Sequence, residues 1–209
     1  MGEYFFIKGF FVGLWVAAPV GPVGALCIRR TLLCGRWSGL ATGLGAATAD
    51  CFYGVVAAYG LASISLVLIK YQELVRLIGG LLLLYIGVKT FFSNMRQKIV
   101  IHKEQSLLAD YFSTVFLTLA NPLTIVAFVA LFTGLGVGGL RAGFLGATFM
   151  VLGVISGSVL WAVVLSFGLD SFRANFNSLV LKVVNLISGL IIVGFAVSML
   201  IGVFEFLFE

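Results

Sequence analysis

The stretch "AAPVGPVGALCIRR", residues 17–30, places two prolines and two glycines inside an apolar run and closes it with two arginines. Proline has no amide hydrogen to donate, and its ring pushes the carbonyl four residues earlier out of the helical hydrogen-bond ladder. Pro19 and Pro22 therefore predict a broken helix that frees the carbonyls of Trp15 and Ala18. Free backbone groups cannot face an apolar surrounding, so we expect the break to point into protein or into a wet cavity.

The composition around this break is that of an integral membrane protein. Of 209 residues, 61% are hydrophobic and 10% are charged, and the mean hydropathy is +1.18. A helix that crosses a membrane needs about 20 apolar residues. Six segments are long enough, namely 9–28, 51–69, 74–92, 111–140, 142–169 and 183–204. We expect an all-α protein with six transmembrane helices, a first helix that is not a cleaved signal peptide, and no soluble domain.

The two halves of the chain resemble each other. "TADCFYGVVAAYGL" (48–61) aligns without a gap with "SGSVLWAVVLSFGL" (156–169), and "IGGLLLLYIGVKTFF" (78–92) aligns with "ISGLIIVGFAVSMLI" (187–201). Each half holds three helices, an odd number, so the second copy must enter the membrane from the opposite face. The sequence therefore predicts two inverted three-helix repeats, residues 1–105 and 106–209, an organisation typical of secondary transporters.

The break itself is repeated. With a short gap, the same alignment brings Gly21-Pro22 of the first helix onto Asn121-Pro122 of the fourth, and Pro122 is expected to free the carbonyl of Thr118. Proline kinks are common in membrane helices, and the Thr118 hydroxyl could repair this one. A matched pair of breaks favours a binding site instead, because half-helix ends offer amides to a carboxylate and carbonyls to an ammonium group.

Asp50 is the costly residue of the second helix. A carboxylate near the middle of the membrane costs about 2.5–3.5 kcal/mol on insertion scales. Asp50 can be a hydrogen-bonded group that joins helices, or a carboxylate that couples protons or binds an ammonium group. Its repeat partner is Ser158, so the titratable group stands in one half only. Tyr53 and its partner Trp161 lie about one turn further and could line the same cavity or pack as aromatic core.

The candidate substrate or ion site thus combines the two breaks with the polar and aromatic residues near Asp50. Its members are Pro19, Gly21, Pro22, Asp50, Tyr53, Asn121, Pro122, Ser158 and Trp161. If the halves are inverted copies, the two breaks should face each other across a pseudo-twofold axis in the membrane plane, and Asp50 should border the same cavity.

Other classes of function leave no trace in the sequence. It has no HExxH, no GxSxG with partners and no Walker loop, so we expect neither an enzyme, nor a nucleotide-driven pump, nor a cofactor. Three cysteines without CxxC spacing predict neither a disulfide framework nor a metal site. The net charge of +5 is spread among loops, which argues against a nucleic-acid partner.

The positive charges predict the orientation. Of the 13 Lys and Arg residues, nine lie in or beside the loops 28–37, 93–110 and 170–182, and four lie on the other side. Cytoplasmic loops carry the excess of positive charge, so both termini are expected outside. Glycines spaced by four, such as Gly35, Gly39 and Gly43, allow close helix packing and are compatible with a homodimer.

Two stretches, "APVGPVGALCIRRTLLCGRWSGLATGLGAATADCFYG" (18–54) and "ANPLTIVAFVALF" (120–132), resemble the LysE/RhtB-type amino-acid exporters, and the resemblance covers essentially the whole chain. It implies export of amino acids or related small metabolites across a bacterial inner membrane, driven by the proton motive force. Two features differ from many members. The compact Pro-Gly-Pro is stretched to "PVGP", and Leu123 stands where a cation often follows Asn-Pro.

Residues and resemblance together predict a proton-coupled secondary exporter with alternating access around a site at the middle of the membrane. Its partners would be a small-molecule substrate and the lipid bilayer. Two alternatives remain at this level. An inorganic cation exporter of a related superfamily is disfavoured by the single carboxylate and by the lack of a histidine or methionine-rich site. In a non-transporting membrane scaffold, the breaks would be proline kinks and Asp50 would be a hydrogen-bonded group that joins helices.

Overall fold

A computed structural model describes residues 2–18, 21–59, 71–92, 106–121, 124, 127–128, 131–132, 143–172 and 178–208. Within these ranges the regular structure is entirely helical. The helices are α1 (Gly2–Ala17), α2 (Pro22–Cys34), α3 (Arg36–Ala58), α5 (Gln72–Phe91), α6 (Leu107–Leu119), α8 (Gly143–Phe172) and α9 (Ser178–Phe208). The expected all-α class is confirmed for the part of the chain that the structure describes.

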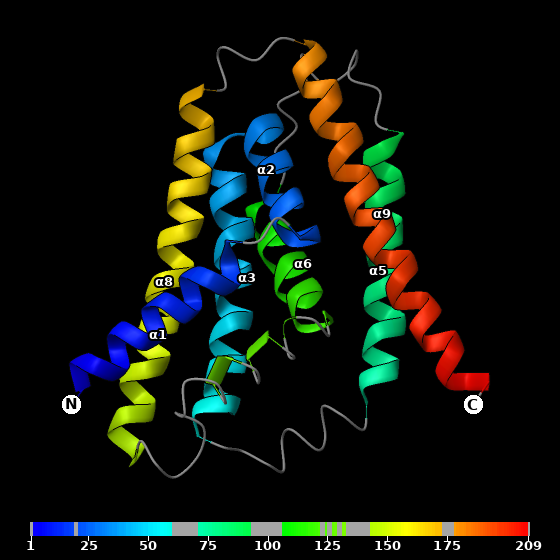
Figure 1. Ribbon diagram of the computed structural model, residues 1–209. Helices are drawn as coiled ribbons and strands as arrows, with labels where there is room; N and C mark the ends of the chain where they lie inside the picture. Colours follow the sequence, from blue (N-terminus) through cyan, green and yellow to red (C-terminus); the bar gives the residue numbers. More distant parts are fainter. Residues whose placement is uncertain are drawn as a thin grey trace.

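The helices run up and down in alternation (Figure 1). Helix α1 rises from the lower end to the middle of the bundle, and α2 continues to the upper end. Helix α3 returns downward, α5 rises, α6 descends to the middle, α8 rises over the full height and α9 descends. The start of α1 and the end of α9 therefore lie at the same end of the bundle.

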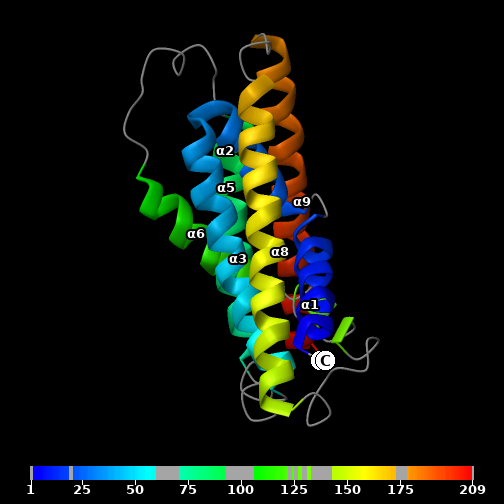
Figure 2. The same cartoon turned by 90° about the vertical axis from the view of Figure 1, so that its left-hand side faces the viewer.

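Helices α3 and α8 form the centre of the bundle. They pack against each other, α1 packs on the far side of α8, and α6 packs on the far side of α3 (Figure 2). Helices α5 and α9 pack together as a separate pair, and α2 connects this pair to α3 and α8. Helices α1 and α6 thus flank the central pair from opposite sides.

Length and apolar composition identify the helices that can cross a membrane. Among the described residues these are α3, α8 and the segment Lys182–Val203 of α9. Helices α1 and α2 pass the same test together as a pair bent by 76°, whereas α6 is shorter. At most four spans are identified in this way, so the expected six are shown only in part. Large apolar side chains such as Phe11, Tyr85 and Phe144 are exposed on the outside of the bundle, as contact with lipid requires.

The first break lies between Ala17 and Pro22. Gly21 precedes α2 as its N-cap, and Pro22 is the first helical residue. Proline is well suited to this position, because the amide hydrogen it lacks would have no partner within the helix. Pro19 lies outside the described residues. At its other end, α2 stops at Gly35, whose φ of 95° favours glycine and turns the chain directly into α3.

Helix α3 begins earlier than the charge-free run 51–69 suggests, because it spans Arg36–Ala58. Asp50 lies within it and does not end it, since the carboxyl group is buried and hydrogen-bonded. A buried and hydrogen-bonded polar group can lie inside a membrane-spanning helix. The charge-free run 51–69 therefore misses the first part of α3.

Helices α1 and α8 meet backbone to backbone. Each presents two glycines four residues apart, namely Gly9 and Gly13 on α1 and Gly153 and Gly157 on α8. A methyl group on any of the four would collide with a main-chain carbonyl of the other helix. Small residues at this spacing allow membrane helices to approach closely. In the glycine series noted from the sequence, a methyl group on Gly43 would collide with Ala162 of α8.

Candidate functional site

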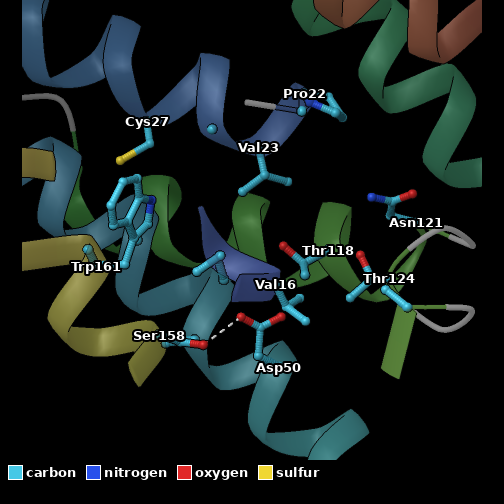
Figure 3. Close-up of a pocket in the computed structure, with 18 of the residues that line it drawn as sticks. Val16, Pro22, Val23, Cys27, Asp50, Thr118, Asn121, Thr124, Ser158 and Trp161 are labelled. Atoms are coloured by element: carbon cyan, nitrogen blue, oxygen red, sulfur yellow. Dashed lines mark hydrogen bonds between the residues drawn. The ribbon is translucent and has the colours of Figure 1, made fainter. Parts of the chain in front are cut away.

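A cavity of about 380 Å³ lies between the end of α1, the start of α2, α3, the end of α6 and α8. Its described lining is mostly apolar, with bulky side chains such as Trp15, Leu165 and Phe195. The polar side chains in the described lining are Asp50, Thr118, Asn121, Thr124 and Ser158, and the indole of Trp161 lies among the apolar ones. Figure 3 shows them around one space.

Six of the nine residues predicted for the site line this cavity, namely Gly21, Pro22, Asp50, Asn121, Ser158 and Trp161. Tyr53 is not among the lining residues. Pro19 and Pro122 fall outside the described residues. The start of α2 and Asn121, which follows α6, therefore border the same space as Asp50.

Asp50 and Ser158 join α3 to α8 at the bottom of this space. The Ser158 hydroxyl lies 2.9 Å from Oδ2 of Asp50 and 3.2 Å from the Gly13 carbonyl of α1. Both side chains are almost fully buried, at 3% and 2% exposure. The hydroxyl has a single hydrogen, so it can donate to one of these two acceptors at a time.

The end of α6 differs from the expectation at Thr118. Its carbonyl accepts a hydrogen bond of 3.1 Å from the Asn121 amide, so the expectation of a freed carbonyl is wrong. The Thr118 hydroxyl does not repair the break, because it is buried and has no hydrogen-bond partner in the part of the chain that the structure describes. A buried hydroxyl without a partner is uncommon and costs free energy. Here it borders the cavity.

Tyr53 packs in the hydrophobic core next to the site and bonds the end of α6. Its ring belongs to a buried hydrophobic cluster with Phe128 and Met150, and its hydroxyl donates a hydrogen bond of 2.6 Å to the Leu119 carbonyl. That carbonyl stands in the last turn of α6, where helical carbonyls lack partners within the helix. Aromatic packing was the alternative reading of Tyr53, and the geometry agrees with it.

A second polar cluster, missed by the sequence analysis, lies toward the upper end of the bundle. Nε of Arg30 on α2 lies 3.1 Å from Oδ1 of Asp110 on α6, and both side chains are buried. Four hydroxyl side chains complete the cluster, those of Ser38, Thr42, Ser113 and Thr114. Arg30 donates to three of these and to the Asp110 carbonyl, and Ser38 donates to the carboxylate. The pair is satisfied on every side, which a buried ion pair requires.

One signal in the sequence could have revealed this pair. Arg30 ends one apolar segment and Asp110 opens another, and the predicted topology puts both on the same side of the membrane. Counting Arg30 only as a charge that orients the chain concealed its partner. Its neighbour Arg29 likewise donates a hydrogen bond of 2.6 Å, to the side chain of Asn185 on α9.

Metal ligands do not gather in the described part of the chain, where no group of three or more His, Cys, Asp or Glu side chains is placed to hold an ion.

Two curated bacterial proteins are similar to this chain. "Putative amino acid efflux protein YcgF" of Bacillus subtilis (strain 168) is 30% identical over 130 residues, which cover 61% of each chain. "Uncharacterized membrane protein YahN" of Escherichia coli (strain K12) is 28% identical over 131 residues, which cover 58% of this chain and 57% of that protein. The chain thus matches less than two thirds of the length of either relative. No solved structure matches it.

The profile of the LysE type translocators matches residues 14–202, which include the break before Pro22, Asn121 after α6 and the whole described lining of the cavity. This match extends over nearly all of the sequence, and it agrees with the resemblance found in the motifs around Pro22 and Asn121. Translocators of this family are transporters and not enzymes. The chain belongs to the LysE type translocator family.

Proposed function

We propose that this protein is a proton-coupled secondary exporter of amino acids or related small metabolites in a bacterial inner membrane. The observation that carries the proposal is the central cavity, where the start of α2 and Asn121, just beyond α6, border the same space as Asp50. Sites built from interrupted helices near mid-membrane are typical of secondary transporters. Family membership and the printed name of the Bacillus subtilis relative support the same class of activity.

The packing supports a six-span inverted repeat, with residues 1–105 and 106–209 as its halves. Helix α1 packs on α8 and α6 packs on α3, which is the exchange of partners that inverted halves require. Helices α1 and α6 also enter from opposite ends of the bundle (Figure 1). Asp50 and Ser158, equivalent in the internal alignment, are hydrogen-bonded, as residues near a pseudo-twofold axis would be.

The arrangement suggests how substrate and proton could be coupled. Asp50 is the one acidic side chain in the described lining. It can be neutralised by a proton or by a substrate ammonium group, and these two exclude each other at one carboxylate. A buried charge must be paired, so the empty and unprotonated site is disfavoured. Exchange of a substrate moving outward for a proton moving inward follows from this competition.

Ser158 can link the protonation of Asp50 to the contact between α8 and α1. When Asp50 is ionised, Ser158 can donate to it, and the Gly13 carbonyl then loses that donor. When Asp50 is protonated, it can donate to Ser158, which leaves the Ser158 hydrogen for Gly13. The bond between α8 and α1 thereby depends on the proton at Asp50. Helix α1 could move along its glycine contacts with α8 as the cavity changes sides.

The orientation proposed from the positive charges places both termini outside. The two termini lie at one end of the bundle, which an even number of crossings requires. Arg30 at the opposite end is paired with Asp110, whereas Arg29 is bonded to the neutral side chain of Asn185 and keeps its charge in the bias. Cysteine accessibility at both ends, measured in intact cells, tests this orientation. Light scattering of the purified protein in detergent tests a homodimer.

Efflux by living cells tests the proposed function. Cells with and without the gene are challenged with a panel of toxic amino-acid analogues, dipeptides and metal ions, and the purified protein is assayed in liposomes with an imposed pH gradient. We expect resistance to some analogues and gradient-driven export. Resistance to metal ions alone would favour the cation exporter. If cells with and without the gene do not differ in resistance to any compound and the liposomes show no flux, the non-transporting scaffold is favoured and the proposal is contradicted.

A further inference from the structure

We infer that the cavity recognises the zwitterion of an amino acid with an uncharged, largely apolar side chain, and that Thr118 with the first amides of α2 holds the substrate carboxylate. This assignment rests on the proposed function and specifies its substrate class. Three features of the described cavity lining support the assignment. They are the hydrogen-bond donors at the start of α2 and at Thr118, the acidic group of Asp50, and an apolar wall around the rest of the space.

The start of α2 provides backbone donors to the cavity. Gly21, Pro22, Val23 and Gly24 all line it. No side chain caps this helix, because the N-cap is Gly21. Pro22 has no amide hydrogen, and the first intrahelical bond in this turn runs from Ala25 to the Gly21 carbonyl. The amides of Val23 and Gly24 therefore stand at the positive end of the helix dipole, where an anion is stabilised.

Thr118 supplies a second and independent donor. Its side chain is 4% exposed, borders the cavity, and has no hydrogen-bond partner in the described structure. In Figure 3 the side chain of Thr118 projects from α6 into the space below Pro22 and Val23 and above Asp50. A bound carboxylate would satisfy this hydroxyl.

The charges of the lining match a zwitterion. Asp50 can pair with the ammonium group, and no Lys or Arg side chain belongs to the described lining. A second positive charge on a substrate would find no second carboxylate there, and a second negative charge would find no cation. Burying an unpaired charge costs several kcal/mol, so basic and acidic amino acids should be rejected.

The remaining wall is apolar. Trp161, Ala162 and Leu165 of α8 line one side of the cavity, and Phe195 of α9 adds a further ring. In Figure 3, Trp161 lies across the space from Thr118 and Asn121. A substrate whose two charged groups are held by Asp50 and Thr118 would therefore direct its side chain toward an apolar surface. Buried apolar area is favourable for such a side chain and not for a charged one.

Exchange in liposomes tests the assignment. The purified protein is reconstituted, exchange of labelled L-leucine is measured, and L-valine, L-lysine, L-glutamate and L-leucinamide are added as competitors. We expect L-valine to compete. L-Lysine, L-glutamate and L-leucinamide should compete at least about tenfold more weakly than L-valine. L-Leucinamide keeps the ammonium group and the side chain but has no carboxylate, so it isolates the proposed contact.

The variant Thr118→Val gives the residue-specific result. Loss of one hydrogen bond to a charged group should weaken competition by L-leucine about tenfold. Competition by L-leucinamide should not change. The control Thr148→Val removes a hydroxyl of α8 that bonds Tyr59 outside the cavity, and it should alter neither. Thr118→Ser keeps the hydroxyl and should retain the affinity, which separates a lost contact from poor folding.

The outcomes are distinguishable. If L-lysine or L-glutamate is exchanged as well as L-leucine, the charge argument fails while the proposed export of amino acids stands. If Thr118→Val weakens L-leucine and L-leucinamide equally, Thr118 does not hold the carboxylate. If the protein exchanges no amino acid but confers metal resistance, the proposed function and this assignment both fail.

Discussion

The Ser158 hydroxyl and the Asp50 carboxylate are hydrogen-bonded across α3 and α8, and these are the two residues that the internal alignment of the halves makes equivalent. Equivalent residues of inverted halves can touch only where the pseudo-twofold axis passes between them. The contact therefore marks the centre of the proposed symmetry. It also marks where that symmetry is broken, because one partner can carry a charge and the other cannot.

Replacing Asp50 with Asn should abolish coupling without unfolding the protein. Asparagine has nearly the same shape, and its carbonyl can still accept from Ser158. It can neither bind a proton nor pair with an ammonium group. Export driven by a pH gradient should fall to the rate of empty liposomes, while the unfolding midpoint changes by less than about 4 °C. Retained, gradient-dependent export by the folded variant would rule out this role.

The bond between Ser158 and Asp50 should be stronger when Asp50 is ionised. Ser158→Ala should destabilise the protein by about 1.5–3 kcal/mol if it donates to a carboxylate, and by about 0.5–1.5 kcal/mol if it donates to an amide. A double-mutant cycle with Asp50→Asn, measured by unfolding in detergent, gives the difference. Equal losses in both backgrounds would mean that Ser158 serves the Gly13 carbonyl alone.

Breaking the buried ion pair should be costly from either side. Arg30→Met leaves Asp110 unpaired, and Asp110→Leu leaves Arg30 unpaired, so each change should cost about 3–5 kcal/mol. The double variant leaves no uncompensated charge and should be more stable than either single variant. Thermal unfolding of the three proteins checks this. Losses that simply add would contradict the reading of these residues as a mutually dependent pair.

The glycine contacts of α8 should tolerate no added methyl group. In Gly157→Ala the new Cβ would collide with the Phe10 carbonyl of α1, so we expect a loss of about 1–3 kcal/mol. Gly168→Ala is the matched control on the same helix, because its Cβ would meet open space. Alanine is also the better helix former, so this control should be as stable as the parent or more so. Fluorescence-detected size exclusion with heating compares the two.

The sequence predicted the components of the site better than their bonds. Proline chemistry located the first break, and the alignment of the halves made Asp50 and Ser158 equivalent, whereas their hydrogen bond is known only from the fold. That the Thr118 hydroxyl has no partner among the described residues could not be foreseen, because a threonine four residues before a proline could equally well have bonded to its own helix. Whether a buried hydroxyl finds a partner depends on tertiary packing.

The buried pair of Arg30 and Asp110 was missed for a different reason. Counting Lys and Arg residues assigns each loop to one side of the membrane. It carries no information about distances between segments far apart in the chain. Tyr53 illustrates the same limit. Its spacing from Asp50 is compatible with a cavity wall and with an aromatic core, and only the fold places its hydroxyl against the Leu119 carbonyl of α6.

Asp50, the one carboxylate in the described lining of the cavity, has an electrical consequence. An amino acid with an uncharged side chain has no net charge, so exchanging it for one proton moves one positive charge inward in each cycle. Export would then be driven by a voltage negative inside the cell, even where the pH is equal on both sides. The movement of one charge across 100 mV is worth about 2.3 kcal/mol. A current should therefore accompany export, and its size should report one charge for each substrate molecule.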